Sequence, residues 1–303
     1  SADRPRAAPP VEDLDLIETL IGEHGGDPET FEGELIRQII ETALKLIREG
    51  HDTGQLKLIT ASIKEMRYAY RVFNEYVGTP KVTIFGSART PPEHPDYAAA
   101  IEFSERLAAL GWMSITGAGG GIMQAGHEGP QRDASFGLSI HLPFETTANP
   151  VIEGDPKLIN FRYFFTRKLM FMSHAQAVAV FPGGFGTQDE LFESLTLVQT
   201  GKSNIIPIVL VEGAGGAYWH YWERYIQKNL LEGGMISPED RSLYHIAADV
   251  PEAIDHIIQF YRVYHSARYV GRKLVIRLRT PLAEKHIDAL NERYPMLIRS
   301  GRI

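Results

Sequence analysis

The stretch from Ala177 to Val198 constrains the fold more than any other part of the chain. It begins with five consecutive apolar residues, Ala177–Phe181, continues through the glycine-rich turn Pro182–Gly186, and ends with apolar residues at helical spacing. An unbroken apolar run is typical of a strand that is buried on both faces, as in a parallel sheet. The stretch therefore predicts a buried strand, a tight turn and a helix.

The turn itself predicts a ligand. Its three glycines, Gly183, Gly184 and Gly186, leave no side chains to keep a ligand away from the backbone. The N–H groups at the start of the next helix point toward the turn, and the helix dipole favours an anion there, so we predict a phosphate-binding site. An alternative interpretation needs no ligand, because Thr187 and Glu190 have the spacing of a helix capping box.

Composition narrows the class of protein. The 303 residues suffice for one large domain with extensions or for two domains. The net charge is −7 and no long basic run offsets it, so neither nucleic acid nor an anionic membrane is an expected partner. The absence of cysteine excludes disulfides and thiolate chemistry. No apolar stretch reaches the ~18 residues of a membrane span and no signal peptide is evident, so we expect a cytoplasmic protein.

The chain is expected to have three parts. Residues 1–78 show helical spacing of apolar residues and no strand pattern, which predicts an N-terminal helical extension. Residues 79–262 alternate apolar strands with helices, which predicts an α/β domain with a doubly wound, mostly parallel sheet. Residues 263–303 form a short C-terminal extension. Strands are expected at 81–85, 112–116, 135–142, 176–181, 205–211, 243–246 and 273–278, a loop at 143–160, and a helix at 283–294.

Turns that follow the expected strands can line one crevice, because ligands bind beyond the carboxyl ends of the strands in such sheets. Four turns are in this position: Gly86–Ser87, Gly117–Gly121, Pro143–Asn149 and Pro182–Thr187. We expect Ser87 to donate a hydrogen bond to the ligand, since no base that would activate it as a nucleophile can be identified.

The ligand is expected to be a mononucleotide or a sugar phosphate. Gly117–Gly121 follows a strand and precedes a helix, as a dinucleotide fingerprint does. However, an NAD site needs an acid near the end of the next strand, and the nearest one, Glu145, lies beyond a proline. Neither glycine cluster is followed by the lysine of a triphosphate-binding loop. Alternatively, this cluster serves only the packing of helix against strand.

Two adjacent cations, Arg167 and Lys168, lie on the helix expected before the central strand. They suit a phosphate dianion, which arginine can bind through two hydrogen bonds, although an exposed helix face would also explain them. The histidines His127, His141 and His174 do not have metal-binding spacing, so we expect no metal site.

Together these residues resemble the LONELY GUY (LOG) family, the cytokinin riboside 5′-monophosphate phosphoribohydrolases, many of which were long labelled possible lysine decarboxylases. The family pattern P-G-G-x-G-T-x-x-E is complete from Pro182 to Glu190. The Arg-Lys pair of the family matches Arg167 and Lys168. Thr116–Met123 is similar to its second glycine loop, with alanine at position 118 where glycine is commoner. The resemblance covers residues 80–262.

The resemblance implies hydrolysis of the N-glycosidic bond of a nucleoside 5′-monophosphate, either a cytokinin riboside monophosphate or AMP, to free base and ribose 5-phosphate. It implies no cofactor and no metal, a homo-oligomer (dimer or higher), and Arg167 and Glu190 as the catalytic residues. It also implies a set of substrate-binding residues: Gly86, Ser87, Gly119, Gly121, Glu145, Lys168, Gly183, Gly184, Gly186 and Thr187.

Two other functions remain open on the sequence. One is a non-catalytic nucleotide-binding or sensor protein on the same fold, and the other is a carrier of a phosphate-bearing cofactor such as molybdenum cofactor. The presence of both Arg167 and Glu190 favours hydrolysis, because phosphate binding alone needs only the glycine turn and a cation.

Overall fold

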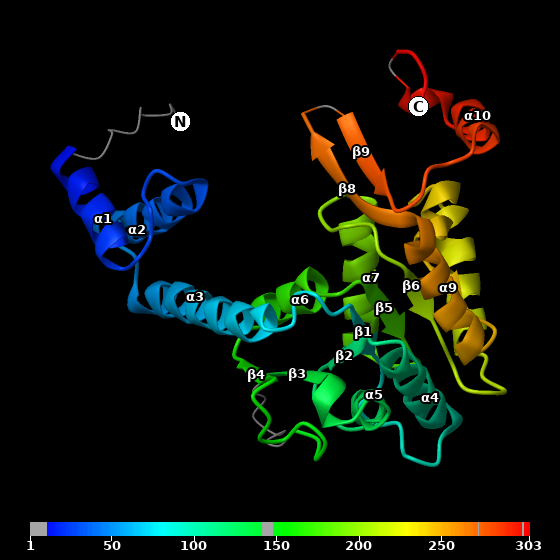
Figure 1. The fold of residues 1–303 in the computed structure, drawn as a ribbon. Helices are drawn as coiled ribbons and strands as arrows, with labels where there is room; N and C mark the ends of the chain where they lie inside the picture. The colour runs from blue at the N-terminus through cyan, green and yellow to red at the C-terminus, as the bar shows by residue number, and fades with distance from the viewer. Residues whose placement is uncertain (1–10, 141–147, 272, 299) are drawn as a thin grey trace. The chain divides into compact units, whose positions relative to one another are not determined.

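The computed structural model of the chain describes residues 11–140, 148–271, 273–298 and 300–303 (Figure 1). Two compact units are present, residues 1–61 and residues 62–303. The helix α3 (Thr53–Asn74) contributes residues to both units. The division at residues 78 and 262 that we expected from the sequence stays a prediction.

The first unit is helical, and its helix ends follow from local sequence. It contains α1 (Val11–Glu23), α2 (Phe31–Glu49) and the start of α3. The Thr30 side chain accepts a hydrogen bond from the N–H of Gly33 at 3.1 Å, which caps α2. Among its described side chains only a few are buried, and several large apolar ones are exposed, including Phe31, Ile36, Ile39, Leu44 and Ile47. The expected homo-oligomer stays a prediction that light scattering can check.

A seven-stranded sheet forms the centre of the second unit (Figure 1). All of its neighbouring strands are parallel, in the order β4-β3-β2-β1-β5-β6-β7. Successive strands therefore add outward from β1 to β4, and the chain then returns to β5 on the other side of β1. This confirms the doubly wound parallel sheet. The strands are β1 (Lys81–Phe85), β2 (Met113–Thr116), β3 (Ser135–Ile140), β4 (Leu158–Phe161), β5 (Ala177–Val180), β6 (Ile208–Leu210) and β7 (His245–Ile246).

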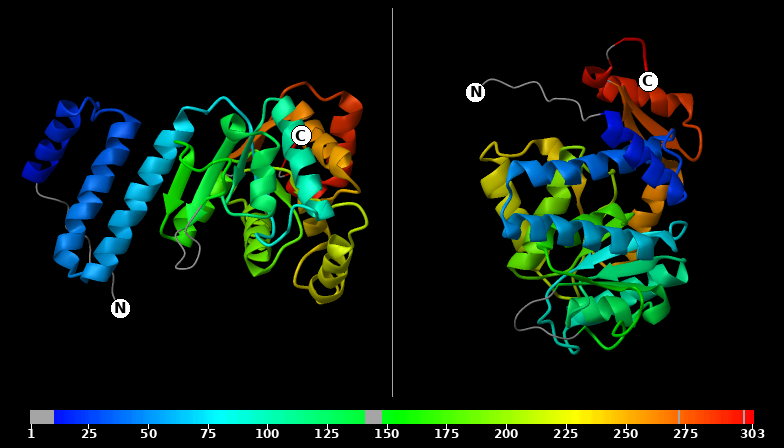
Figure 2. Two further views of the ribbon diagram at one scale, coloured as in Figure 1. Left: turned by 90° about the horizontal axis from the view of Figure 1, so that it is seen from below. Right: turned by 90° about the vertical axis from the view of Figure 1, so that its left-hand side faces the viewer.

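Helices cover both faces of the sheet and create two apolar cores (Figure 2). Alternate residues of each strand point to opposite faces, so in β1 Val82 and Ile84 join one core and Phe85 joins the other. One face carries α4 (Pro95–Ala109), α5 (Ile122–Glu128) and α9 (Val250–Val263). The other carries the end of α3, α6 (Phe164–Ser173), α7 (Phe185–Gln199) and α8 (Tyr218–Tyr225).

Two strands correct the expectations from the sequence. The region expected to be a loop at 143–160 contains the start of β4, which pairs with β3 at the edge of the sheet. In the C-terminal extension, β8 (Tyr264–Val270) pairs antiparallel with the expected strand β9 (Lys273–Leu278), ahead of α10 (Glu284–Arg293). The strand β4 has only four residues, which are too few to show an alternating apolar pattern in the sequence. The polar and mostly exposed β8 lacks the apolar pattern of a buried strand.

Within the described residues, no helix combines the length and the apolar character that crossing a bilayer requires.

The aromatic contact between α3 and the sheet gives a stability prediction. Phe73 is 1% exposed, and its ring stacks on Phe136 at 4.5 Å and on His174 at 3.9 Å between centroids. Phe73→Ala should lower the free energy of unfolding by ~3–5 kcal/mol, measured by urea denaturation, because it leaves a cavity among packed rings. The control Val77→Ala changes a side chain that is 77% exposed and should stay within ~0.5 kcal/mol of the parent. Equal losses in the two variants would contradict this packing.

Candidate active site

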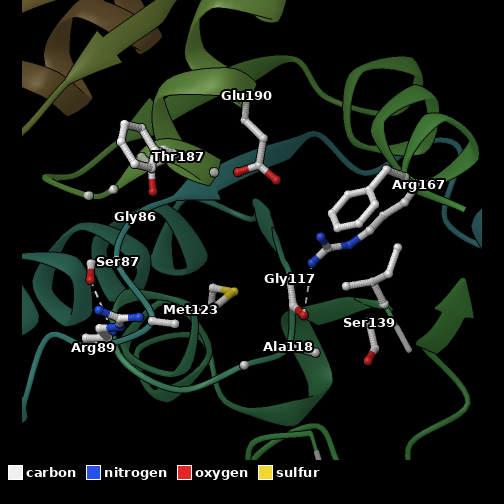
Figure 3. Close-up of a pocket in the computed structure, with 18 of the residues that line it drawn as sticks. Gly86, Ser87, Arg89, Gly117, Ala118, Met123, Ser139, Arg167, Thr187 and Glu190 are labelled. Carbon is white, nitrogen blue, oxygen red and sulfur yellow. Dashed lines mark hydrogen bonds between the residues drawn. The ribbon is translucent and has the colours of Figure 1, made fainter. Parts of the chain in front are cut away.

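A cavity of about 1060 Å³ lies at the carboxyl ends of the central strands (Figure 3). It forms there because the connection after β1 leads to α4 on one face of the sheet, whereas the connection after β5 leads to α7 on the other. The N–H of Ser87 donates a hydrogen bond to the carbonyl of Pro182 at 3.1 Å, which joins the turns that follow these two strands. Both turns therefore face the same cavity.

The glycine turn places the start of α7 at the wall of the cavity. Gly184 is the N-cap residue, and Gly184, Gly186 and Thr187 all line the cavity. Residue 183 must be glycine, because a Cβ there would collide with the Thr187 side chain. The first N–H groups of a helix have no intrahelical acceptors, so this wall of the cavity suits an anion.

The capping-box interpretation of Thr187 and Glu190 was wrong. The helix α7 begins at Phe185, two residues before the start that the sequence predicted, and among the described residues no side chain caps it. Thr187 is therefore already inside the first turn, and its side chain packs against Gly183. Glu190 is left free of a capping contact, and Figure 3 shows its carboxylate pointing into the cavity.

Glu190 is a half-buried ionisable group at the cavity wall. Burial raises its pKa to about 7, against the lowering effect of the nearby Arg167 and Lys168 charges. Within the described part of the chain, no hydrogen bond stabilises the carboxylate. The group can therefore give up or accept a proton near neutral pH, as a general acid or base must.

Arg167 is held against the cavity wall by backbone carbonyls. The side chain is 8% exposed, its Nε donates to the carbonyl of Leu138 at 2.7 Å, and its Nη2 donates to the carbonyl of Gly117 at 3.3 Å. The guanidinium also lies over the ring of Phe171, 5.1 Å from its centroid. Glycine at residue 117 leaves room for the guanidinium in this position, because a Cβ would force the Arg167 side chain to shift. These contacts fix a positive charge beside Glu190.

Lys168 is directed elsewhere. Its Nζ forms ion pairs with Asp189 at 2.7 Å and Glu193 at 2.8 Å, both on α7, and the residue does not line the cavity. Successive residues of a helix point about 100° apart, so only one member of the Arg-Lys pair can face the cavity. The structure thus separates two residues that the sequence grouped as one phosphate-binding pair.

Of the other residues expected at the site, some line the cavity and others do not. Gly86, Ser87 and Gly119 line the cavity. Gly121 does not line it: its φ is +60°, and a Cβ there would collide with the carbonyl of Ser87, so glycine allows the two loops to approach each other. Glu145 lies outside the described residues.

Sequence reasoning missed a set of contacts behind the glycine turn. The hydroxyl of Tyr218 donates to the carbonyl of Gly183 at 2.6 Å and accepts from Gln188 at 2.7 Å. The indole N–H of Trp222 donates to the same glutamine at 2.9 Å. No sequence pattern could show this connection, because α8 follows β6 and meets the turn only in the fold. Arg89 also lines the cavity, and its position just after Ser87 was a signal in the sequence that could have predicted this.

Comparisons with known proteins identify the family of the chain. Residues 119–257 match a protein family described as "Possible lysine decarboxylase". The chain is 30% identical over 161 residues to the cytokinin riboside 5′-monophosphate phosphoribohydrolase LOG1 of Arabidopsis thaliana, covering 51% of this chain and 70% of that protein. It is 26% identical over 167 residues to LOG3 of the same plant, covering 54% and 74%. The chain therefore belongs to the LOG family.

A solved structure that is similar to this chain is the molybdenum cofactor carrier protein of Chlamydomonas reinhardtii. It has 20% sequence identity and a TM-score of 0.42, over 60% of this chain and 97% of that one.

The raised pKa of Glu190 gives a prediction about stability. With a folded-state pKa of about 7 against an ordinary 4.5, ionisation opposes folding as pH rises above 4.5, and the opposition is complete above pH 7. Glu190→Gln should therefore raise the free energy of unfolding at pH 8 by about 2 kcal/mol and leave it unchanged at pH 4, measured by denaturant titration. Glu153→Gln, which changes an exposed carboxylate of the same cavity, is the control and should have no such pH-dependent gain. A gain at pH 8 that persists at pH 4 would contradict the assignment.

Proposed function

We propose that the protein hydrolyses the N-glycosidic bond of nucleoside 5′-monophosphates, with cytokinin riboside monophosphates and AMP as the first substrates to test. The observation that carries this proposal is the Glu190 carboxylate, which faces the cavity with a pKa of about 7. The names of the relatives support the same reaction, since they are cytokinin riboside 5′-monophosphate phosphoribohydrolases.

The wall formed by α7 suits the two ends of such a substrate. Its N-terminal N–H groups and the Thr187 hydroxyl would bind the 5′-phosphate. Glu190 lies three residues further along the helix, a rise of about 4.5 Å, so its carboxylate would face the ribose rather than the phosphate. The volume of the cavity, about 1060 Å³, leaves room for a purine base.

The chemistry requires a carboxylate at this point. Departure of the base breaks the bond between the anomeric carbon and the base nitrogen, and positive charge builds on the ribose ring. The ionised Glu190 would stabilise that charge and accept a proton from the attacking water, whose oxygen bonds to the anomeric carbon. The departing base takes up one proton, so the products are free base and ribose 5-phosphate.

Arg167 would hold the reacting groups in place. Its guanidinium is bound by two backbone carbonyls, so little reorganisation is needed when a negatively charged substrate enters. Its charge also lowers the pKa of Glu190, which keeps a larger fraction of the carboxylate ionised at neutral pH.

A protein that only binds nucleotides would not need this carboxylate. A negative charge beside an anionic ligand opposes binding, and burying it without a hydrogen-bond donor lowers stability. This combination favours turnover over storage or sensing.

The proposal predicts turnover that depends on one carboxylate. The full chain should release free base from AMP and from isopentenyladenosine monophosphate, detected by chromatography, with kcat/KM rising through pH about 7 as Glu190 ionises. Glu190→Gln should lower kcat by ~10²-fold or more and leave nucleotide affinity within a few-fold, since the phosphate contacts remain.

The control Glu153→Gln should keep the turnover and the pH profile of the parent. If no base is released from a broad panel of nucleotides, the protein is not a hydrolase of this class. If base is released equally well by Glu190→Gln, the carboxylate has no catalytic role.

A further inference from the structure

Three buried polar residues behind the second glycine loop take no part in the proposed chemistry. Thr116, His127 and Asn149 are 0%, 0% and 4% exposed, and none of them lines the cavity. They come from the end of β2, from α5 and from the segment that precedes β4. Buried polar groups are costly unless they are hydrogen-bonded, so their partners are informative.

The partners of His127 define its protonation. Its Nε2 lies 3.0 Å from the carbonyl oxygen of Phe136 and 3.0 Å from the Thr116 hydroxyl. A carbonyl only accepts, so Nε2 carries the proton and Nδ1 is the acceptor. The side-chain N–H of Asn149 donates to Nδ1 at 3.1 Å. Burial lowers the pKa of His127 to about 4, so the ring stays neutral and keeps this pattern at neutral pH.

Asn149 and Thr116 in turn hold the glycine loop. The backbone N–H of Asn149 donates to the carbonyl of Ala118 at 2.7 Å, and its side chain donates to the carbonyl of Gly119 at 3.1 Å. The Thr116 hydroxyl accepts from the N–H of Ala118 at 3.1 Å. The loop is therefore hydrogen-bonded on both sides of one residue.

That residue is strained. Ala118 has a φ of +64°, in the left-handed region that residues with a side chain rarely adopt. Such a conformation persists only where the surrounding contacts determine it. Here the contacts that determine it come from Asn149 and Thr116, both of which His127 orients.

The loop meets the active site at Gly117. Its carbonyl accepts from the Nη2 of Arg167, and Figure 3 shows Gly117, Ala118 and Arg167 on the same side of the cavity. A change in the loop therefore moves the acceptor that orients the guanidinium opposite Glu190.

We propose that His127 is a positioning residue, which acts through Asn149 and Thr116 to fix the strained turn at Ala118 and, through Gly117, to set the position of Arg167 relative to Glu190. The effect of this positioning of Arg167 on turnover rests on the proposed function. The geometric coupling itself can be measured without turnover.

The test is a direct titration of the Glu190 carboxyl by ¹³C NMR in the full chain labelled at glutamate, with Glu190→Gln to assign the signal. His127→Gln places an amide near Nε2 and leaves nothing at Nδ1, so it breaks the link to Asn149. We expect the pKa of Glu190 to rise by about half a unit to one unit, because the Gly117 carbonyl shifts and the Arg167 guanidinium moves away from the carboxyl group. His127→Asn restores a polar atom near Nδ1 and should recover most of the shift.

A double-mutant cycle tests the strained turn. Glycine adopts positive φ without a steric penalty, so Ala118→Gly removes the need for the contacts that hold the loop. His127→Gln should therefore shift the pKa of Glu190 less in the Ala118→Gly background than in the parent. If the enzyme turns over AMP, kcat/KM should follow the same order, with about a tenfold loss for His127→Gln alone.

His174→Gln is the matched control, because His174 is another neutral histidine of the same unit, with a pKa lowered to about 4 by burial and the charge of Lys81. It packs on Phe73, away from the glycine loop, so it should reduce stability and leave the pKa of Glu190 unchanged. If His127→Gln also lowers stability without moving that pKa, or if Ala118→Gly leaves its effect intact, the inference is wrong. If the parent shows no turnover, the proposed function is refuted. The inference about His127 is still tested, because the titration of Glu190 does not depend on turnover.

Discussion

The parallel pairing of β1 with β5 is the constraint on which the candidate active site depends. These two strands are neighbours in the sheet, although β2, β3 and β4 lie between them in the chain. Their connections leave toward opposite faces, so the space beyond their ends stays open, and one hydrogen bond between Ser87 and Pro182 keeps the two turns in contact. The glycine loops, Arg167 and Glu190 are all placed relative to this junction.

The sequence predicted what is local in this arrangement. A run of five apolar residues, a glycine turn and a helix follow one another directly from Ala177 onward, so their types and order could be inferred without tertiary information. The cavity residues near Gly86, Gly117 and Gly183 could be predicted for the same reason, because each glycine follows a strand. The sheet class follows from the alternation of strands with helices.

Features that depend on helix phase or on distant contacts could not be predicted. The start of α7 at Phe185 could not be separated from a start at Thr187, because both residues follow glycine and the capping pattern fits the later start. The different orientations of Arg167 and Lys168 depend on how α6 is rotated against the sheet. The contacts of Tyr218 and His127 join elements that are far apart in sequence, and neither residue belongs to a pattern.

The burial of Glu190 affects both the stability of the folded chain and the acid–base chemistry of the site. Removing the carboxylate from water lowers the stability of the folded chain at neutral pH and brings its proton affinity into the range useful for catalysis. The fold tolerates this because the surrounding sheet is buried on both faces and contributes two apolar cores. A destabilising site of this kind requires a fold whose other interactions provide enough stability to compensate.

The ion pairs of Lys168 have a mechanical consequence. Because the Lys168 ammonium group joins Asp189 and Glu193 on α7 to the residue next to Arg167 on α6, sliding or rotation of either helix would separate these charges. These ion pairs thereby link the helix that carries the arginine to the helix that carries the carboxylate. Motions that admit a ligand then fall more easily to the loops around the cavity than to a change in the spacing of α6 and α7.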